Sequence, residues 1–520
     1  MKGGAAKVAA WVLLFTALAI SLTTETHTKA ILPLHHGYLS SMGLAMGKNL
    51  DRQHHFLLYT RKWVDPQGTS GVDPHNRFPI LSYVLIGASV SKCSDDPVCE
   101  MTRGRTLMLL FAWGALVLAT LILWEITLNP LLSVGAALIG FSSYFIQYYD
   151  DMIFNDVPAL FGFLLVLYGI TLFETRGTLW VLWLGTMLAI ALGWQPYGAL
   201  VTWWVLTAVR SIVAGGLKEG IGSLFRHWAT RTMVMAVSWG CLLLAFNIFN
   251  EKSALQVPVS ELPSVKSIEF RLGASGGSTQ FPEYQELRWK NFLNKQARRV
   301  MKATIPTRPL HAAINEASEK GSRTVKVAMG LAGLALALLA AFGLGRLLLR
   351  KKEERVALLA LLLSGLVWCL SMRHFTAFHD FQAMFYVGFA MVFWLAIFSV
   401  LPEKALGTVA ALALAVYAFS AFDLNRFKTE EGQSFESRTT DFAAIRKVVG
   451  EDRRVQVGQT DAEFDTEFVP FRFYMAGNYY SDPTHAQFII TRDRSFASPN
   501  LTPANQEYFL FHAKPPGASP

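Results

Sequence analysis

Charged residues are scarce in this chain. Only 16% of its 520 residues are Asp, Glu, Lys or Arg, whereas 52% are hydrophobic and the mean hydropathy is +0.32. Soluble domains typically have about a quarter charged residues, so the shortfall argues against an ordinary soluble protein. Residues 8 to 422 instead contain about eleven apolar runs, each near the length that spans a bilayer.

Other features are missing too. The net charge is +9, but there is no basic and aromatic patch of the kind that binds nucleic acid, and the basic residues gather at the ends of apolar runs. There is no Gly-rich phosphate loop in the C-terminal region, which disfavours nucleotide binding. There is also no convincing internal repeat and no long low-complexity stretch. These absences leave a membrane protein as the main interpretation.

The basic residues predict the orientation of the chain. With a cytoplasmic N-terminus, the strongly basic short segments all fall on the cytoplasmic side, as the positive-inside rule requires. An odd number of spans then places the C-terminal ~100 residues outside. Residues 8–22 could instead be a signal peptide, but we expect an uncleaved helix that anchors the following loop. The expected spans are 8–23, 105–125, 131–147, 157–174, 178–193, 199–214, 232–249, 325–345, 356–372, 383–400 and 405–422.

This pattern predicts an all-α polytopic membrane domain, residues 1–422, followed by a small extracytoplasmic α/β module, residues 423–520. The membrane domain has two long outer loops, 24–104 and 250–323, and two short outer turns, 147–156 and 373–382. Residues 78–90 are apolar but short, so they are expected to lie in the interface. In the module we expect a helix at 441–450 and strands at 454–458, 471–475, 487–491 and 508–512.

Four cysteines are present, and two of them fall close together in the first outer loop. Cys93 and Cys99 are separated by a short segment that can turn, and thiols outside the cytoplasm tend to oxidise. We therefore expect a disulfide. The alternatives are two free thiols or metal ligands, but no neighbouring histidine favours a metal. Cys241 and Cys369 fall inside helices and are expected to be packing residues.

The polar residues suited to catalysis fall in the outer segments. If these segments converge, they bring carboxylates, imidazoles and guanidinium groups to one membrane face, which suits general-base chemistry beside a bound phosphate. We expect one of the second-loop aspartates to lie within about 10 Å of the first-loop histidines, with His379 on the same wall. The candidates are His35, His36, Arg77, Arg103, Tyr149, Asp150, Asp151, Asn155, Asp156, Arg373, His379 and Asp380.

Each candidate also has a plainer interpretation. The aspartates could end or cap helices, the paired histidines could be structural, and Arg373 could contact lipid headgroups. Trp194 and Gln195 lie in a polar and aromatic turn near the same face. That turn could line a sugar pocket or be an interfacial anchor.

Several motifs carry a resemblance to a known family. These are residues 75–81 (HNRFPIL) before the interfacial segment, Arg103 and Arg105 before the second span, Asn155-Asp156 before the fourth span, and His379-Asp380-Phe381 in the last outer turn. Together with the order of spans and loops, they resemble the GT-C superfamily of integral-membrane glycosyltransferases, in particular the protein-mannosyltransferase and aminoarabinose-transferase-like branch.

One position departs from that family. An Asp or an Asp-Glu pair usually follows the first helix there and serves as catalytic base, but this chain has His35-His36. A histidine can take the role because its pKa lies near working pH, and the second-loop aspartates are the other candidates.

The resemblance implies a function. We expect transfer of a sugar from a polyprenyl-phosphate-linked donor to a glycan, lipid or protein hydroxyl at the outer face of a membrane. The compact outer segments favour the bacterial inner membrane. Asp150, Asp151, Asp156, His35 or His36 would be the base. The donor phosphate would be bound by Arg373, Arg77, Arg103 or His379.

No cofactor is required by the sequence, although a divalent cation could assist, and nucleic acid is not expected as a partner. The alternatives are a non-catalytic scaffold or lipid-glycan binder of the same fold and, less favoured, a transporter, which would have broken and polar helices near the bilayer midplane.

Overall fold

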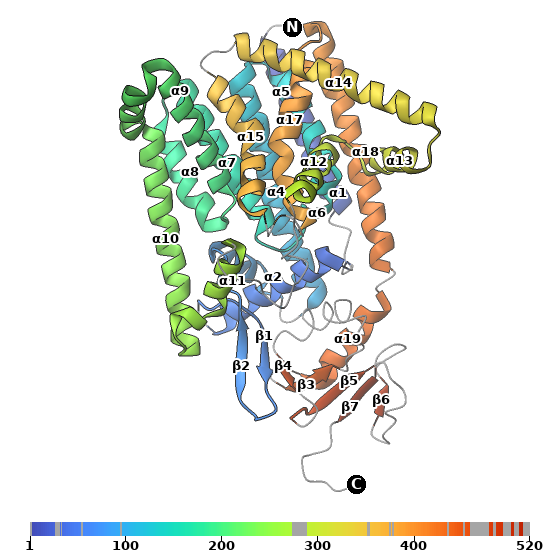
Figure 1. Ribbon diagram of the computed structural model, residues 1–520. Helices are drawn as coiled ribbons and strands as arrows, with labels where there is room; N and C mark the ends of the chain where they lie inside the picture. The colour runs from blue at the N-terminus through green and yellow to red at the C-terminus, as the bar shows by residue number, and fades with distance from the viewer. Residues whose placement is uncertain are drawn as a thin grey trace.

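The computed structural model describes most of the helical region and parts of the C-terminal module. The described residues are 3–25, 32, 34–53, 56–93, 96–272, 289–350, 354–373, 376, 379–433, 436–450, 453–457, 478–481, 485–491, 501–503 and 509–512. Helices dominate (Figure 1). The first helix begins at one end of the helical bundle, and a small sheet of the described C-terminal strands lies beyond the other end, here called the sheet end.

The first half of the bundle is built from ten helices among the described residues. Eight of them are apolar, and α2 and the short α6 are the exceptions. Their bounds are α1 Gly3–Glu25, α2 Leu34–Gln53, α3 Leu81–Val90, α4 Pro97–Thr127, α5 Pro130–Phe141, α6 Tyr144–Tyr149, α7 Asp156–Arg176, α8 Leu179–Leu192, α9 Pro196–Arg226 and α10 Trp228–Leu255.

The second half begins with short helices and returns to long ones. The short 3-10 helices η1 (Val259–Glu261), η3 (Asp380–Tyr386) and η4 (Glu403–Ala405) lie between them. The α-helices are α11 Pro263–Leu272, α12 Trp289–Thr304, α13 Arg308–Lys320, α14 Arg323–Arg350, α15 Arg355–Ser371, α17 Val387–Phe398, α18 Leu406–Gln433 and α19 Glu436–Val449.

From α1 to α18 the chain has the helices of a polytopic membrane protein. Within the described residues, eight helices are long and apolar enough to cross a membrane, and four shorter apolar helices accompany them. Each of the eleven expected spans overlaps one of these helices. The expected span 131–147 is divided into α5 and α6 because the chain breaks at Ser142 and Ser143.

The helices differ in how much of their apolar surface is buried inside the protein. In the apolar windows of α7 and of Asp380–Phe398, 78% and 83% of the residues are buried, whereas for α14 the figure is 11%. Helices such as α14 therefore turn apolar side chains outward, which in a bilayer places them against lipid instead of water. The interior helices α4, α5, α7, α15 and α17 form the core, and their ends at the sheet end carry the candidate site.

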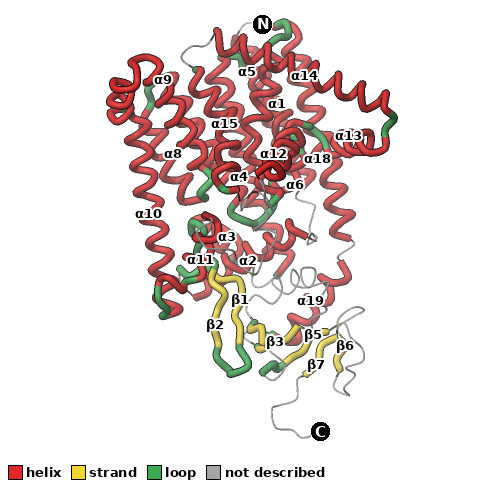
Figure 2. Tube along the Cα trace, viewed as in Figure 1, coloured by secondary structure: helices red, strands yellow, loops and turns green. Residues whose placement is uncertain are grey.

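Among the described residues, seven strands form one sheet beyond the bundle (Figure 2). Its order is β2-β1-β4-β3-β5-β7-β6. Strands β3 Arg454–Val457, β5 Phe488–Thr491 and β7 Phe509–His512 match the expected ones, while β4 Tyr479–Ser481 and β6 Leu501–Pro503 were not expected. The expected strand 471–475 and the glycine-rich segment 273–278 lie outside the described residues.

The other two strands come from the first long loop. Strands β1 Tyr59–Val64 and β2 Ser70–Pro74 form an antiparallel hairpin, and β1 pairs in parallel with β4 of the C-terminal region. The module is therefore joined to the membrane domain by main-chain hydrogen bonds, in addition to its covalent link after α18.

The expected disulfide is present. Cys93 and Cys99 are bonded, with Cα atoms 5.5 Å apart. The bridge links the end of α3 to the first turn of α4, where Asp96 caps the helix by accepting a hydrogen bond from the Val98 amide and Pro97 occupies the first turn. It therefore fixes the angle between the interfacial helix and the second span.

Candidate active site

Helix α2 rests on the loop between α6 and α7. The Ser40 hydroxyl accepts a hydrogen bond from the Ile153 amide at 3.1 Å. One turn later, a Cβ at Gly43 would overlap the Ile153 carbonyl oxygen, so only glycine permits this close approach. The two contacts fix α2, and with it His36, against the loop that carries Asp150 and Asp151.

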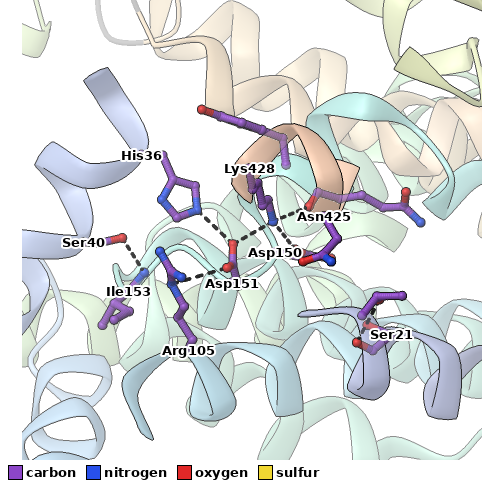
Figure 3. A network of polar contacts seen from close by, with 12 residues as sticks. Ser21, His36, Ser40, Arg105, Asp150, Asp151, Ile153, Asn425 and Lys428 are labelled. Atoms are coloured by element: carbon purple, nitrogen blue, oxygen red, sulfur yellow. Dashed lines mark hydrogen bonds and ion pairs between the residues drawn. The ribbon is translucent and has the colours of Figure 1, made fainter. Parts of the chain in front are cut away.

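Asp151 lies at the centre of a buried network of charges (Figure 3). Its Oδ1 atom is 2.8 Å from His36 Nε2 and 2.8 Å from Lys428 Nζ. Arg105 Nε lies 3.4 Å from the other carboxylate oxygen. Four elements far apart in sequence meet here: α2, α4, the loop after α6 and the end of α18. The expected closeness of a second-loop aspartate and a first-loop histidine is confirmed.

The charges in this network are fixed by their surroundings. Burial alone would raise the pKa of Asp151, but Lys428, His36 and Arg105 outweigh it and hold that pKa well below its usual range. Burial lowers the pKa of His36 to about 4, against the opposing pull of Asp151. At neutral pH, Asp151 is therefore an anion and His36 is a neutral imidazole that donates its Nε2 proton to the carboxylate.

The second ring nitrogen of His36 points to a different role. Among the described residues, Nδ1 is buried and has no hydrogen-bond partner. With Nε2 protonated, Nδ1 carries the lone pair and can accept a proton. Tyr148 and Tyr149 flank the ring, at centroid distances of 5.5 and 6.2 Å. The pair thus has the chemical form of a base oriented by a carboxylate.

Lys428 also fixes α6. Its Nζ donates to the Gln147 carbonyl oxygen at 2.9 Å and lies 3.4 Å from Asp150 Oδ1. The Tyr148 hydroxyl donates to Glu431, one turn further along α18, at 3.0 Å. The last turns of α18 therefore clamp α6 and the aspartate loop together. Lys428 was not among the expected residues, because a lysine at the end of a span is usually an interfacial anchor.

Asp156 belongs to a separate polar cluster. Its Oδ1 accepts hydrogen bonds from Gln195 at 2.8 Å and from Gln382 at 2.7 Å, and the Trp368 indole donates to Gln382 at 2.9 Å. Asp156 is the first residue of α7, and its neighbour Asn155 accepts from the Tyr83 hydroxyl at 3.2 Å. These contacts join α7, α9, α15 and η3, and they support a structural role.

The turn at residues 373–382 pairs its acid, Asp380, with another element. Asp380 lies 2.6 Å from Arg299 of α12, which also donates to the Thr376 carbonyl. The His379 ring stacks near Phe381 at 5.1 Å, and Phe381 in turn lies 6.0 Å from Tyr149. This turn therefore reaches the His36 side of α6 through two aromatic rings.

Helix α12 presents a cationic pocket of about 480 Å³ beside that turn. Four cations and one carboxylate line it: Lys295, Arg298, Arg299, Lys302 and Asp380. Phe145 of α6 and two asparagines complete the lining. Burial, then the nearby Arg299, lowers the pKa of Lys295, against the opposing pull of Asp380. The excess of positive charge suits an anion such as a phosphate.

This pocket was missed in the sequence. Residues 250–323 were expected to be a loop, yet α12 buries Phe292, Gln296, Arg299 and Ala303 at helical spacing. That spacing was the available signal. The Trp394 indole donates to the Thr304 carbonyl at 3.0 Å and so fixes the end of α12 to α17.

The other expected arginines lie elsewhere. Arg103 is exposed on α4, and it is Arg105, one of the two arginines of that motif, that reaches Asp151. Arg77 bonds His75 at 2.7 Å and Ser267 of α11 at 3.1 Å. The guanidinium of Arg373 lies over the Trp289 ring at 4.5 Å, at the start of α12. Of the residues expected to bind the donor phosphate, Arg373 contacts α12 and His379 lies in the turn that contacts α12. Arg77 instead contacts α11.

Three further expectations concern Trp194, His35 and a metal ion. The Trp194 indole donates to the Arg77 carbonyl at 2.8 Å and stacks with Tyr197, which fits an anchoring role. The side chain of His35 lies outside the described residues. Within the described part of the chain, no group of three or more His, Cys, Asp or Glu side chains is arranged to hold a metal ion.

The architecture is similar to that of solved membrane proteins. The chain is similar to ArnT from Cupriavidus metallidurans in a crystal structure bound to undecaprenyl phosphate, with a TM-score of 0.54, 10% identity and 98% of each chain covered. The apo structure of ArnT from the same source gives a TM-score of 0.50 at 12% identity, covering 98% of this chain and 99% of that one. The chain has the GT-C fold.

More remote GT-C structures match as well. The Archaeoglobus fulgidus oligosaccharyltransferase in complex with Zn and sulfate gives a TM-score of 0.48 at 12% identity, covering 92% of this chain and 68% of that one. No protein-family model and no curated protein matches the sequence. At 10% identity, the match to ArnT establishes the fold and does not by itself establish an activity.

Proposed function

We propose that this protein transfers a sugar from a polyprenyl-phosphate-linked donor to an acceptor hydroxyl at the outer face of a membrane. The observation that carries the proposal is the pairing of His36 with Asp151 on one side of α6, while Phe145 of the same helix lines a cationic pocket. A base and a phosphate site separated by one short helix are what transfer from a phosphate-linked sugar needs. The GT-C fold supports the same assignment.

The donor phosphate is assigned to the α12 pocket. Arg298, Lys295 and Lys302 would bind its oxygens, and Arg299 is held in place by Asp380. ArnT, which has a similar fold, was crystallised with undecaprenyl phosphate. The polyprenyl chain would extend into the bilayer along the apolar helices, and the sugar would point toward Tyr149 and His36.

The base is assigned to His36, which is neutral at working pH and can take a proton there, although burial lowers its pKa to about 4, below the value near working pH that the sequence led us to expect. Its Nδ1 takes the proton of the acceptor hydroxyl as that oxygen attacks the anomeric carbon. The bond from that carbon to the phosphate oxygen breaks, and polyprenyl phosphate leaves with the electron pair, stabilised by the α12 cations. Asp151 orients the ring and stabilises the imidazolium that forms. Because His36 is fully buried, the acceptor must displace a neighbouring side chain to reach Nδ1.

One observation favours a second candidate, a non-catalytic scaffold or lipid-glycan binder of this fold. Asp151 is fully buried among three cationic or hydrogen-bonding partners, and a network of that kind can serve folding alone. The two candidates share the lipid site but differ in chemistry. Binding and turnover must therefore be measured separately.

Binding tests the donor site. Undecaprenyl phosphate is added to the purified protein in lipid nanodiscs, and the bound lipid is measured by native mass spectrometry. We expect the double variant Arg298→Gln with Lys302→Gln to bind at least tenfold more weakly, because each lost charge-assisted contact contributes about 1.5 kcal/mol or more. Lys290→Gln, on the same helix but outside the pocket lining, is the control. Equal binding by all three proteins would remove the donor site from α12.

A further inference from the structure

A second cavity, of about 1020 Å³, lies between the β1–β2 hairpin and the end of α10 with η1 and α11. Figure 1 shows these elements together at the sheet end of the bundle, next to α2. The volume is at the upper end of the range for small-molecule sites, which is roughly 300–1,000 Å³. The cavity can therefore take a ligand longer than a single sugar ring.

The lining of this cavity differs in charge from the α12 pocket. It contains two lysines and two carboxylates, so its formal charges cancel, whereas the α12 pocket has four cations and one carboxylate. A site for a phosphate or a polyanion would have excess positive charge. The balanced lining instead suits a neutral ligand rich in hydroxyl groups. The four charged residues are Lys62, Asp73, Glu261 and Lys266.

The cavity also has an aromatic platform. Trp63 lies opposite Gly71 in the hairpin, and a Cβ at Gly71 would overlap the six-membered ring of the indole. Only glycine lets the indole lie across β2. Phe56 and Phe249 are exposed at the cavity and add two further rings. Flat aromatic faces combined with nearby polar groups suit the alternating apolar and hydroxyl faces of sugar rings.

The lining also contains a buried hydrogen-bond donor that is unsatisfied among the described residues. Nδ2 of Asn250 is buried and makes no hydrogen bond among the described residues. A buried donor left unpaired is costly, by about 1–3 kcal/mol, and a ligand hydroxyl in the cavity would satisfy it. This observation is independent of the aromatic platform and of the charge balance.

The cavity is connected to the candidate active site by one short segment. The Asn76 side chain accepts from the Leu58 amide at 2.6 Å, beside the cavity-lining Leu57. Phe78, two residues later, packs its ring 5.4 Å from Phe154, which follows the aspartate loop. Asn247 of α10 donates to the carbonyls of Asn76 and Phe78, both at 2.8 Å, and holds this segment in place.

From these observations we infer that the cavity binds a neutral oligosaccharide, and that the acceptor of the proposed transfer is therefore a glycan. The inference about the acceptor rests on the proposed function, but the binding site itself does not. The glycan would lie along the β1–β2 hairpin with its reacting end directed past Phe78 toward the Asp151 loop.

Saturation-transfer NMR on the full chain tests this. The protein is placed in lipid nanodiscs, because detergents with sugar headgroups would occupy the site. The probes are mannopentaose, arabinopentaose, galactopentaose, tetragalacturonate, glycerophosphoethanolamine and an uncharged polar pentapeptide. We expect at least one of the neutral pentasaccharides to bind and the other three probes not to bind.

Variants locate the binding. Trp63→Ala and Asp73→Asn should each weaken oligosaccharide binding at least tenfold, whereas Trp180→Ala, an exposed tryptophan of α8 outside the cavity, should not. Circular dichroism and gel filtration check that each variant is folded. The inference is overturned if no neutral pentasaccharide binds, if only the charged or peptide probes bind, or if the Trp63 and Asp73 variants bind as well as wild type.

Binding of undecaprenyl phosphate to the wild-type nanodiscs is measured in parallel. Lipid binding without oligosaccharide binding would remove the glycan site and leave the proposed donor site intact. Oligosaccharide binding without lipid binding would do the reverse.

Discussion

At the scale of single residues, Lys428 decides whether Asp151 is a stable buried anion. It is the only partner that contacts the Asp151 carboxylate, the neighbouring Asp150 and the Gln147 carbonyl together within the described network. Removing one member of a buried ion pair leaves the other charge uncompensated, which typically costs 3–5 kcal/mol.

Lys428→Met should therefore lower the free energy of unfolding by about 3–5 kcal/mol. Arg426→Met is the matched control, because Arg426 is exposed on the same helix and pairs only with the exposed Glu430 among the described residues. Thermal melting in the same lipid or detergent measures both. Equal melting temperatures for the two variants would show that the Asp151 network does not stabilise the fold.

His36 predicts how stability depends on pH. Its pKa in the folded protein is about 4, below the ordinary 6.5, so the unfolded chain binds a proton that the folded chain does not. Stability should thus be unaffected above about pH 6.5 and fall as the pH drops from there to about 4, by roughly 3 kcal/mol in total. In His36→Gln that part of the slope should disappear. An unchanged slope in the variant would mean that other groups cause it.

Residue types alone predicted much of this centre. His36, Asp150 and Asp151 were expected in one place because they precede or follow spans that end at the same face. The wider cluster was not predictable. Lys428 and Arg105 each look like ordinary end-of-helix cations in the sequence, and only packing reveals that they are buried. Asp156 was expected in the same cavity, but its three-dimensional neighbours are the amides of Gln195 and Gln382.

At the scale of elements, the contact between α2 and the aspartate loop controls the distance from His36 to Asp151. Gly43→Ala must push the Ile153 carbonyl away, because the added Cβ would overlap it. A displacement of about 1 Å at a reacting centre can cost about 100-fold in rate.

We therefore expect Gly43→Ala to reduce sugar transfer by about 100-fold. Gly222→Ala, in α9, is the control because a Cβ there meets nothing within 4 Å. Initial rates of transfer or donor hydrolysis measure the effect. Full activity in Gly43→Ala would mean that the loop adjusts without moving the dyad.

The sequence predicted those helices that contain a long apolar run. It did not predict the elements that lack one. Each apolar run became a helix. Hydrophobic length does not predict helix α12, because its polar face is strongly basic and it is too hydrophilic to span a membrane. The β1–β2 hairpin was missed because β1 is stabilised by pairing with β4, which lies more than 400 residues away and leaves no local signal.

At the scale of the whole molecule, the start of the first helix and the C-terminal sheet lie at opposite ends of the bundle (Figure 1). The described helix ends next to the basic segments expected on the cytoplasmic side lie at the end of the bundle where the first helix begins, so we expect the sheet, the α12 pocket and the cavity beside the β1–β2 hairpin to lie outside. Alkaline phosphatase fused after Pro520 should be active, and the same enzyme fused after Arg350 should be inactive. The reverse pattern would place the site in the cytoplasm.

The order of spans and loops predicted the overall architecture, because each span has to satisfy its own backbone inside the bilayer and so leaves a local record in the sequence. The joining of the first loop to the C-terminal sheet left no such record. Neither did the separation of the cationic pocket on α12 from the cavity with balanced charges beside the β1–β2 hairpin.

The central claim is that His36, oriented by Asp151, acts as base in sugar transfer from a polyprenyl phosphate donor. The most direct measurement is the release of radiolabelled sugar from polyprenyl-phosphate sugars in proteoliposomes by wild type and by His36→Gln, which keeps a donor for Asp151 but has no basic nitrogen. We expect wild type to consume at least one donor and the variant to be slower by 100-fold or more, with unchanged binding of undecaprenyl phosphate. Equal rates for the two proteins, or no turnover of any donor by wild type, would contradict it.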